Sequence, residues 1–189
     1  EPPEIQAEIR KLMRQNEDAV GLLHFDGDRT LYVCQTTDNS YYMTHRFDRS
    51  EDPAGMIYMD YRNALWPRSA NLILYGHNMM DGSMFKPLMS YLEANFRETH
   101  KSIFLEIDGK QYRYEILAVA ETNTQCSLYQ YTDLSDPVTE SNFRAAILKE
   151  TDLDGILQAP GYLTLSTCNN GGGNSRVLVI AALAGEVSA

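Results

Sequence analysis

Three residues in this sequence have the types and positions that thiol catalysis requires, and all three stand at the ends of predicted β-strands. Residues 162–168 alternate between apolar and polar side chains, as in a strand with one face in a core. Leu163 and Leu165 belong to the core face, whereas Cys168 ends the strand on the polar face, where we expect a substrate to reach it. A cysteine in this setting is a candidate nucleophile, because the thiolate is the reactive form and needs access.

A glycine-rich turn, residues 169–175, leads from Cys168 to a second predicted strand at 176–183, which is apolar on both faces. If the two strands pair as a hairpin, Arg176 stands opposite Cys168, and the Cβ atoms of facing residues are about 4.5–5.5 Å apart. A thiol and a guanidinium would then be neighbours. The turn lacks the G-x-x-x-x-G-K-[ST] pattern and no helix follows it, so we reject a phosphate-binding loop.

The proton carrier that a cysteine nucleophile needs is predicted at His77. This histidine follows the predicted strand at 71–75 and the glycine Gly76, which we expect to let the backbone turn and to leave the imidazole unobstructed. The other three histidines lie within predicted strands or beside a predicted helix. In attack on an amide carbonyl, Cys168 would be the nucleophile, His77 would protonate the leaving amine, and Arg176 would stabilise the oxyanion.

The composition favours one domain and argues against several classes of partner. The 189 residues carry 16 Lys and Arg against 26 Asp and Glu, a formal net charge of −10, which argues against nucleic acid and anionic lipid as ligands. No run approaches the roughly 18 apolar residues of a membrane span, and no signal-peptide pattern opens the chain. The abrupt start at Glu1 suggests part of a longer protein, with room for an upstream anchor.

The three cysteines do not make a disulfide framework, and no pair of Cys or His residues has zinc-ligand spacing, so we expect no metal. Cys34 lies in an apolar run and is predicted to be a core thiol. Cys126 lies in a polar stretch and receives no assignment. An inert thiol is the alternative for Cys168 as well, in which case the chain would be a non-enzymatic, surface-binding β module.

Apolar periodicity and turn signals predict a mainly β, barrel-like domain of about eight short strands with peripheral helices. Helices are predicted at 4–15, at 83–96 and at 141–150, the last capped by Ser141. Residues 26–28 and 108–109 are predicted hairpin turns, and the polar residues 122–139 a long loop. The predicted strands are 20–25, 31–35, 41–47, 55–60, 71–75, 102–107, 110–120, 162–168 and 176–183.

Several of these stretches resemble the motifs of sortases, the cysteine transpeptidases of Gram-positive cell surfaces. Residues 164–168, Thr-Leu-Ser-Thr-Cys, resemble the sortase T-L-x-T-C motif, and Arg176 follows at the spacing of the sortase arginine. Residues 75–77, Tyr-Gly-His, match the sortase histidine motif. The resemblance points to class B on three further stretches, residues 38–43, 59–63 and 76–85.

The resemblance implies an eight-stranded closed sortase barrel with no cofactor and no metal. It implies an N-terminal helix at 1–18 packed on a single catalytic domain at 19–189. Cys168 would form a thioacyl intermediate, His77 would act as general acid and base, and Arg176 would hold the substrate and the oxyanion. The residues implied for binding the sorting signal are Asn39, Met43, Thr124, Tyr129, Ser166 and Thr167.

The implied reaction is cleavage of a C-terminal sorting signal after Thr, followed by transfer of the surface protein to an amine of peptidoglycan or lipid II. Class B favours a signal of the Asn-Pro-x-Thr-x type. The implied location is the extracellular face of the cell membrane of a Gram-positive bacterium, with an anchoring segment upstream of this soluble ectodomain. Two alternatives keep the same three residues: a cysteine endopeptidase and a pilin-polymerising sortase.

One position departs from the pattern of some class B members. Asn169 follows the cysteine where those members carry an acid, so a Cys-His-Asp triad through that position is not available. We therefore expect Asn78 or a backbone carbonyl to orient the imidazole of His77.

Overall fold

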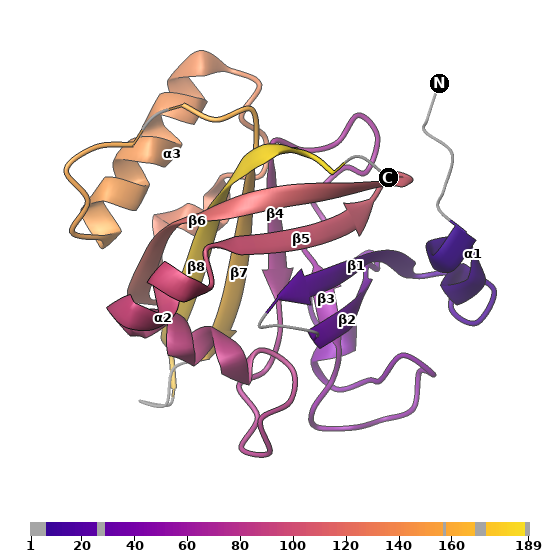
Figure 1. The fold of residues 1–189 in the computed structure, drawn as a ribbon. Coiled ribbons are helices and arrows are strands. Elements are labelled where there is room, and N and C mark those ends of the chain that lie inside the picture. The colour runs from indigo at the N-terminus through magenta and orange to yellow at the C-terminus, as the bar shows by residue number, and fades with distance from the viewer. Residues whose placement is uncertain (1–6, 26–28, 157, 169–172, 188–189) are drawn as a thin grey trace.

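The computed structural model describes residues 7–25, 29–156, 158–168 and 173–187 (Figure 1). Within them, eight strands close into a barrel in the order β1-β2-β3-β4-β7-β8-β6-β5, so the predicted mainly β barrel is confirmed. The strands are β1 Ala19–Phe25, β2 Arg29–Cys34, β3 Ile57–Met59, β4 Asn71–Tyr75, β5 Ser102–Ile107, β6 Lys110–Asn123, β7 Tyr162–Cys168 and β8 Ser175–Glu186.

Strands β4, β7 and β8 lie side by side in the barrel wall (Figure 1). β4 and β7 are parallel, with Tyr75 opposite Ser166, so both strands end at the same edge of the barrel. β7 and β8 are antiparallel, with Cys168 opposite Arg176, which confirms the hairpin pairing predicted from the sequence. The pairing of these three strands therefore decides which residues meet at that edge.

The barrel interior is a continuous apolar core to which β1 to β8 all contribute. Leu163 and Leu165 are fully buried in it, as the alternation of β7 predicts, together with Leu72 and Leu74 of the neighbouring strand. Burial of four such side chains on one pair of strands is worth about 1.5–3 kcal/mol each. The core therefore holds β4 and β7 firmly in register.

The polar face of β7 is buried along the strand up to Cys168, which alternation by itself does not indicate. Helix α3, Pro137–Glu150, and the segment before it pack over this face. Tyr162 contacts Phe143 of that helix edge to face, with ring centroids 5.0 Å apart, and Ser166 is 3% exposed. Within β7, solvent reaches only the residue at the end of the strand, Cys168, which is half-buried.

Residues 41–47 do not form the predicted strand. Tyr41–Met43 form a 3₁₀ turn, η1, and the chain then runs irregularly to a short bridge between His45 and Glu51. The cause is Asp38, whose Oδ1 accepts hydrogen bonds from the backbone nitrogens at positions 40 and 41, at 2.6 and 2.8 Å. Local capping of this kind competes with a strand ladder and starts a helical turn instead.

The single helix predicted at 83–96 is two short helices. A 3₁₀ helix, η2, spans Lys86–Leu92, and an α-helix, α2, spans Ala94–Thr99. Glu93 between them has extended backbone angles, which end the first helix. A spacing of three residues is the period of a 3₁₀ helix, and it is the spacing of the buried side chains Phe85, Leu88 and Tyr91.

The first described element is α1, Ala7–Met13, which buries Ile9 and Leu12 against β1. Residues 4–6 of the predicted helix and the predicted turn at 26–28 lie outside the described residues. The division into 1–18 and 19–189 stays a prediction. Among the described helices, none is long and apolar enough to cross a membrane.

The region predicted as one long loop, residues 122–139, is more ordered than expected. β6 continues to Asn123, a 3₁₀ turn, η3, spans Ser127–Gln130, and α3 begins at Pro137 rather than at position 141. The helix cap is therefore not Ser141 but Asp136, whose Oδ2 accepts a hydrogen bond from the backbone nitrogen of Thr139 at 2.8 Å. Proline is favoured in the first turn of a helix, which fits this earlier start.

Replacing the observed cap should destabilise the protein more than replacing the predicted one. We expect Asp136→Ala to lower the free energy of unfolding by about 1 kcal/mol, because it leaves a helix N-terminal nitrogen without its acceptor. The control is Ser141→Ala, an exposed position inside the helix, for which the change should stay within about 0.5 kcal/mol. Urea unfolding of both variants measures the difference, and equal losses would contradict this assignment of the cap.

Candidate active site

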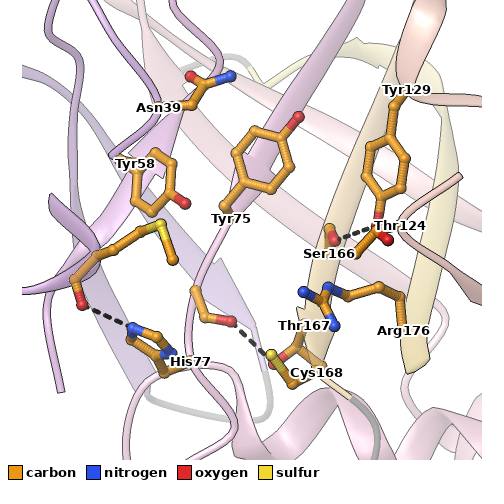
Figure 2. Close-up of a pocket in the computed structure, with 12 residues that line it drawn as sticks. Asn39, Tyr58, Tyr75, His77, Thr124, Tyr129, Ser166, Thr167, Cys168 and Arg176 are labelled. Atoms are coloured by element: carbon orange, nitrogen blue, oxygen red, sulfur yellow. Dashed lines mark hydrogen bonds between the residues drawn. The ribbon is translucent and has the colours of Figure 1, made fainter. Parts of the chain in front are cut away.

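A cavity of about 290 Å³ opens at the barrel edge where β4 and β7 end (Figure 2). Every catalytic and substrate-binding residue predicted from the sequence lines it, although these residues come from five separate segments of the chain. The structure therefore brings together Asn39, Met43, His77, Thr124, Tyr129, Ser166, Thr167, Cys168 and Arg176.

Two tyrosines of the cavity wall were missed by the sequence analysis. Tyr58 and Tyr75 stack with ring centroids 5.2 Å apart, and Tyr75 stacks on Tyr129 at 6.1 Å. Tyr75 could have been found, since it ends β4 just before the glycine and histidine. Tyr58 could not, because only the pairing of β3 with β4 places it opposite Tyr75.

Gly76 also lines the cavity, for a different reason from the one predicted. Its backbone is not in the left-handed region, so the chain does not need glycine for a turn. Glycine is required for space instead: a Cβ would lie 2.4 Å from Cδ1 of Ile57 and 2.8 Å from the ring of Phe85. The backbone of Gly76 donates to the carbonyl of Ser166 at 3.1 Å, and its carbonyl accepts from the hydroxyl of Thr167 at 2.9 Å.

The imidazole of His77 is oriented by a backbone carbonyl. Its Nε2 lies 2.7 Å from the carbonyl oxygen of Met43. The dashed line at His77 in Figure 2 marks this hydrogen bond. Because a carbonyl only accepts, Nε2 carries a hydrogen, and Nδ1 is the nitrogen free to exchange a proton. Of the two expected orienting groups, the backbone carbonyl serves, whereas Asn78 donates to the carbonyl of Cys168 at 3.0 Å.

The thiol and the imidazole shift each other's pKa in opposite directions. Hydrogen bonding with His77 lowers the pKa of Cys168, burial opposes this, and the positive charge of Arg176 adds to it. The pKa of His77 is raised, first by hydrogen bonding with Cys168 and then by the carbonyl of Met43, against the effect of burial. Both shifts favour a thiolate beside an imidazolium, which is the reactive form of a cysteine nucleophile.

Arg176 is held at the cavity by the start of its own strand. Its Nη1 donates to the carbonyls of Gly173 and Ser175, at 3.1 and 2.8 Å. Figure 2 shows the guanidinium beside Cys168, facing the cavity. An arginine keeps its charge at any working pH, so it can stabilise negative charge without exchanging a proton.

The other two thiols are buried. Cys34 has no exposed surface, and burial raises its pKa to about 12, which confirms the predicted core thiol. Cys126 is buried at the start of η3. Cys168 is thus the thiol that solvent reaches. In the described part of the chain, no cluster of His, Cys, Asp or Glu could hold a metal ion.

Comparison with known proteins agrees with this fold and site. Residues 26–184 match the model of the sortase domain family. The sequence is 34% identical to Sortase B of Listeria monocytogenes over 170 residues, covering 88% of this chain and 69% of that protein. It is 31% identical to Sortase B of Staphylococcus aureus over 189 residues, covering 94% of this chain and 75% of that protein. The structure of a Staphylococcus aureus sortase B–substrate complex superposes with a TM-score of 0.86 at 27% identity, covering 98% of this chain and 88% of that one.

The closed barrel and the cavity at its edge define a cysteine transpeptidase, and the chain belongs to the sortase family. Its similarity to two proteins named Sortase B places it in class B, as the sequence motifs predicted.

The pKa of Cys168 should depend mainly on His77. We expect iodoacetamide to alkylate Cys168 of the wild type with a midpoint below the ordinary cysteine value of about 8.5, because its pKa is lowered. His77→Ala should move the midpoint to higher pH and slow the reaction at pH 7, and Arg176→Ala should do the same to a smaller extent. Mass spectrometry of the peptides containing Cys168 and Cys34 measures both rates.

A matched control for this titration is His100→Ala, since His100 stacks on Phe96 and lies outside the cavity. This variant should keep the wild-type profile, and Cys34 should react slowly in every variant. An unchanged Cys168 profile in His77→Ala would show that the imidazole does not activate the thiol. Equal rates for Cys168 and Cys34 would favour the inert-thiol interpretation.

Proposed function

We propose that this sortase cleaves a sorting signal of a surface protein after Thr, through a thioacyl intermediate on Cys168, and passes the acyl group to a cell-wall amine. The observation that carries the proposal is the single cavity that holds a thiol of lowered pKa, an imidazole of raised pKa and a guanidinium. Those are the three groups that acyl transfer from an amide needs.

In the proposed first step, the Sγ of Cys168 bonds to the carbonyl carbon of the signal's threonine. The negative charge that develops on the carbonyl oxygen is stabilised by Arg176, a fixed cation in a partly buried site. Nδ1 of His77 then gives its proton to the departing amine, and the carbon–nitrogen bond breaks. The products are a thioester on Cys168 and a free amine.

In the proposed second step, an acceptor amine attacks the thioester. Nδ1 of His77 takes the proton that the amine loses, and the carbon–sulfur bond breaks to restore the thiolate of Cys168. Because Nε2 stays bound to the carbonyl of Met43 throughout, the same tautomer serves in both steps.

The shape of the cavity supports a peptide substrate. Its wall is formed by the stacked tyrosines Tyr58, Tyr75 and Tyr129, with the polar side chains of Asn39 and Thr124 at its margin. Aromatic faces with a few polar groups suit a short extended peptide containing proline. One related solved structure is named a sortase B–substrate complex, so that protein binds a substrate. We propose a signal of the Asn-Pro-x-Thr-x type for this chain.

The roles of the remaining cavity residues follow from their contacts. The hydroxyls of Tyr129 and Ser166 are hydrogen-bonded to each other at 2.8 Å. One of the two donates in this bond, so the other keeps its hydrogen and can donate to the peptide, while both oxygens can still accept. The hydroxyl of Thr167 already donates to Gly76 and so positions the end of β4. Met43 lines the cavity with 42% of its surface exposed and is proposed to contact the peptide.

The proposed acceptor is an amine of peptidoglycan or lipid II, and the proposed location is the extracellular face of a Gram-positive cell membrane, reached through a segment upstream of this chain. The family match supports a cell-surface role. Anchoring of surface proteins is proposed over pilus assembly, on the similarity to Sortase B proteins.

Removing the thiol should abolish both cleavage and covalent capture. We expect Cys168→Ala to reduce turnover of sorting-signal peptides below about one thousandth of the wild-type rate, because no thioester can form. A peptide library with variable signals, read by mass spectrometry, identifies the preferred substrate and reports the acyl-enzyme mass. Cys126→Ala is the control and should remain active. Full activity of Cys168→Ala would refute the proposed mechanism.

Transfer and hydrolysis are distinguished by the products. With a glycine or diaminopimelate-type peptide as the added amine, we expect the amide product to increase with amine concentration while the free acid decreases. Chromatography of the two products at several amine concentrations measures this partition. Free acid alone at every concentration would show an endopeptidase instead of a transpeptidase.

A further inference from the structure

A buried carboxylate lies behind the cavity and binds two of its lining residues. Asp60, just after β3, has no exposed surface. Its Oδ2 accepts hydrogen bonds from the hydroxyl of Tyr75 at 2.8 Å and from the side-chain amide of Asn39 at 3.1 Å. Burying a charged carboxylate costs free energy unless hydrogen-bond donors surround it. Asp60 therefore restricts the positions of the Tyr75 and Asn39 side chains.

Arg62 completes this arrangement and extends it to a third lining residue. Its Nε and Nη2 donate to the two carboxylate oxygens of Asp60, at 2.9 and 2.8 Å, in the two-pronged geometry typical of arginine. The same Nη2 donates to the backbone carbonyl of Tyr129 at 2.7 Å. The ion pair therefore ties the end of β3 to the segment that follows β6.

Burial alone would raise the pKa of Asp60, but the hydrogen bonds from Arg62 and Tyr75 outweigh it and hold the pKa below its ordinary value. Asp60 is therefore a carboxylate at neutral pH, and its contacts with Arg62 are charge-assisted. Neither Asp60 nor Arg62 lines the cavity itself.

The residues held by the pair lie away from the reacting groups. Figure 2 shows Asn39, Tyr75 and Tyr129 on one side of the cavity, and His77 with Cys168 on the other. Tyr75 and Tyr129 also stack on each other, so a displacement of one moves the other. We call Asn39, Tyr75 and Tyr129 the binding wall.

Building on the proposed function, we propose that the Asp60–Arg62 pair is a positioning unit that holds the binding wall in the shape that the sorting-signal peptide requires. The pair touches neither the thiol nor the imidazole. It sets the affinity for the part of the peptide remote from the scissile bond, and it leaves the chemistry at Cys168 unchanged.

A purely structural ion pair is available for comparison within the same chain. Arg144 donates to Glu140 at 2.9 Å and to the backbone carbonyl of Ile156 at 3.1 Å. Glu140 is also buried, and the two arginines are similarly exposed, at 33% for Arg62 and 28% for Arg144. In both pairs one guanidinium bridges a buried carboxylate and a backbone carbonyl, although Arg144 contacts both oxygens of Glu140 through Nε alone. This second pair holds α3, and neither of its residues lines the cavity.

The experiment compares Arg62→Gln with Arg144→Gln, using the fluorogenic Asn-Pro-x-Thr-x peptide that the wild type cleaves best. We expect Arg62→Gln to raise KM about tenfold with kcat within about twofold, the scale of coupling between contacting residues. The alkylation profile of Cys168 should stay as in the wild type. Arg144→Gln should leave KM unchanged, even if both variants lose similar stability in urea.

Two further measurements separate positioning from a general loss of stability. Tyr129→Phe should raise KM by itself, and adding Arg62→Gln to it should raise KM by less than in the wild-type background, because both act on the same wall. Arg62→Lys should give an intermediate KM, since an ammonium can contact Asp60 or the Tyr129 carbonyl but does not reproduce the two-pronged bridge. If Arg62→Gln does not fold, Arg62→Lys takes its place in the comparison.

Amide hydrogen exchange tests the proposal without any substrate. We expect residues 124–131 to exchange faster in Arg62→Gln than in the wild type or in Arg144→Gln. A wild type that cleaves no sorting-signal peptide would refute the proposed function and leave this exchange result to decide the positioning role. An unchanged KM and unchanged exchange in Arg62→Gln, or an equal rise of KM in Arg144→Gln, would overturn the positioning role.

Discussion

The parallel pairing of β4 with β7 is the interaction on which the site depends. Each residue from Asn71 to Tyr75 pairs with one from Tyr162 to Ser166, and the ladder continues into the hydrogen bond between Gly76 and Ser166. A slip of one residue would turn the buried leucines of the strand that slips to the wrong face, so the core fixes the register. The two strand ends that carry His77 and Cys168 therefore meet as a consequence of core packing.

The reactivity of the thiol reflects a balance between burial and charge. Half-burial of Cys168 disfavours its thiolate, and His77 with Arg176 more than offsets this. The carbonyl that orients His77 comes from a 3₁₀ turn, which Asp38 starts and Gly55 packs against. Gly55 has φ of +57°, and a Cβ there would lie 2.8 Å from the Met43 oxygen. Residues far from Cys168 in sequence thus orient His77, and through His77 they influence the pKa of the thiol.

The predictions from apolar periodicity were wrong where a short-range hydrogen bond or a proline set the local backbone conformation. Asp38 turned the predicted strand at 41–47 into a helical turn, and Asp136 with Pro137 started α3 before Ser141. The polar face of β7 is covered by α3 and the segment before it. Its hydroxyl groups can be buried there because Thr164 and Ser166 both have hydrogen-bond partners. The periodicity of a sequence predicts which side chains share a face of a strand. It does not predict which other element packs on that face.

Alternation, turn residues and contiguous motifs were enough to predict the strands that end in His77 and Cys168, the hairpin that sets Arg176 opposite the cysteine, and the family. Only the folded structure shows the carbonyl that orients the imidazole, the stacking of Tyr58 on Tyr75, and the contacts of the Asp60–Arg62 pair with the binding wall. Each of these joins segments far apart in the chain, and single-residue patterns do not encode which distant segments the barrel closure brings together.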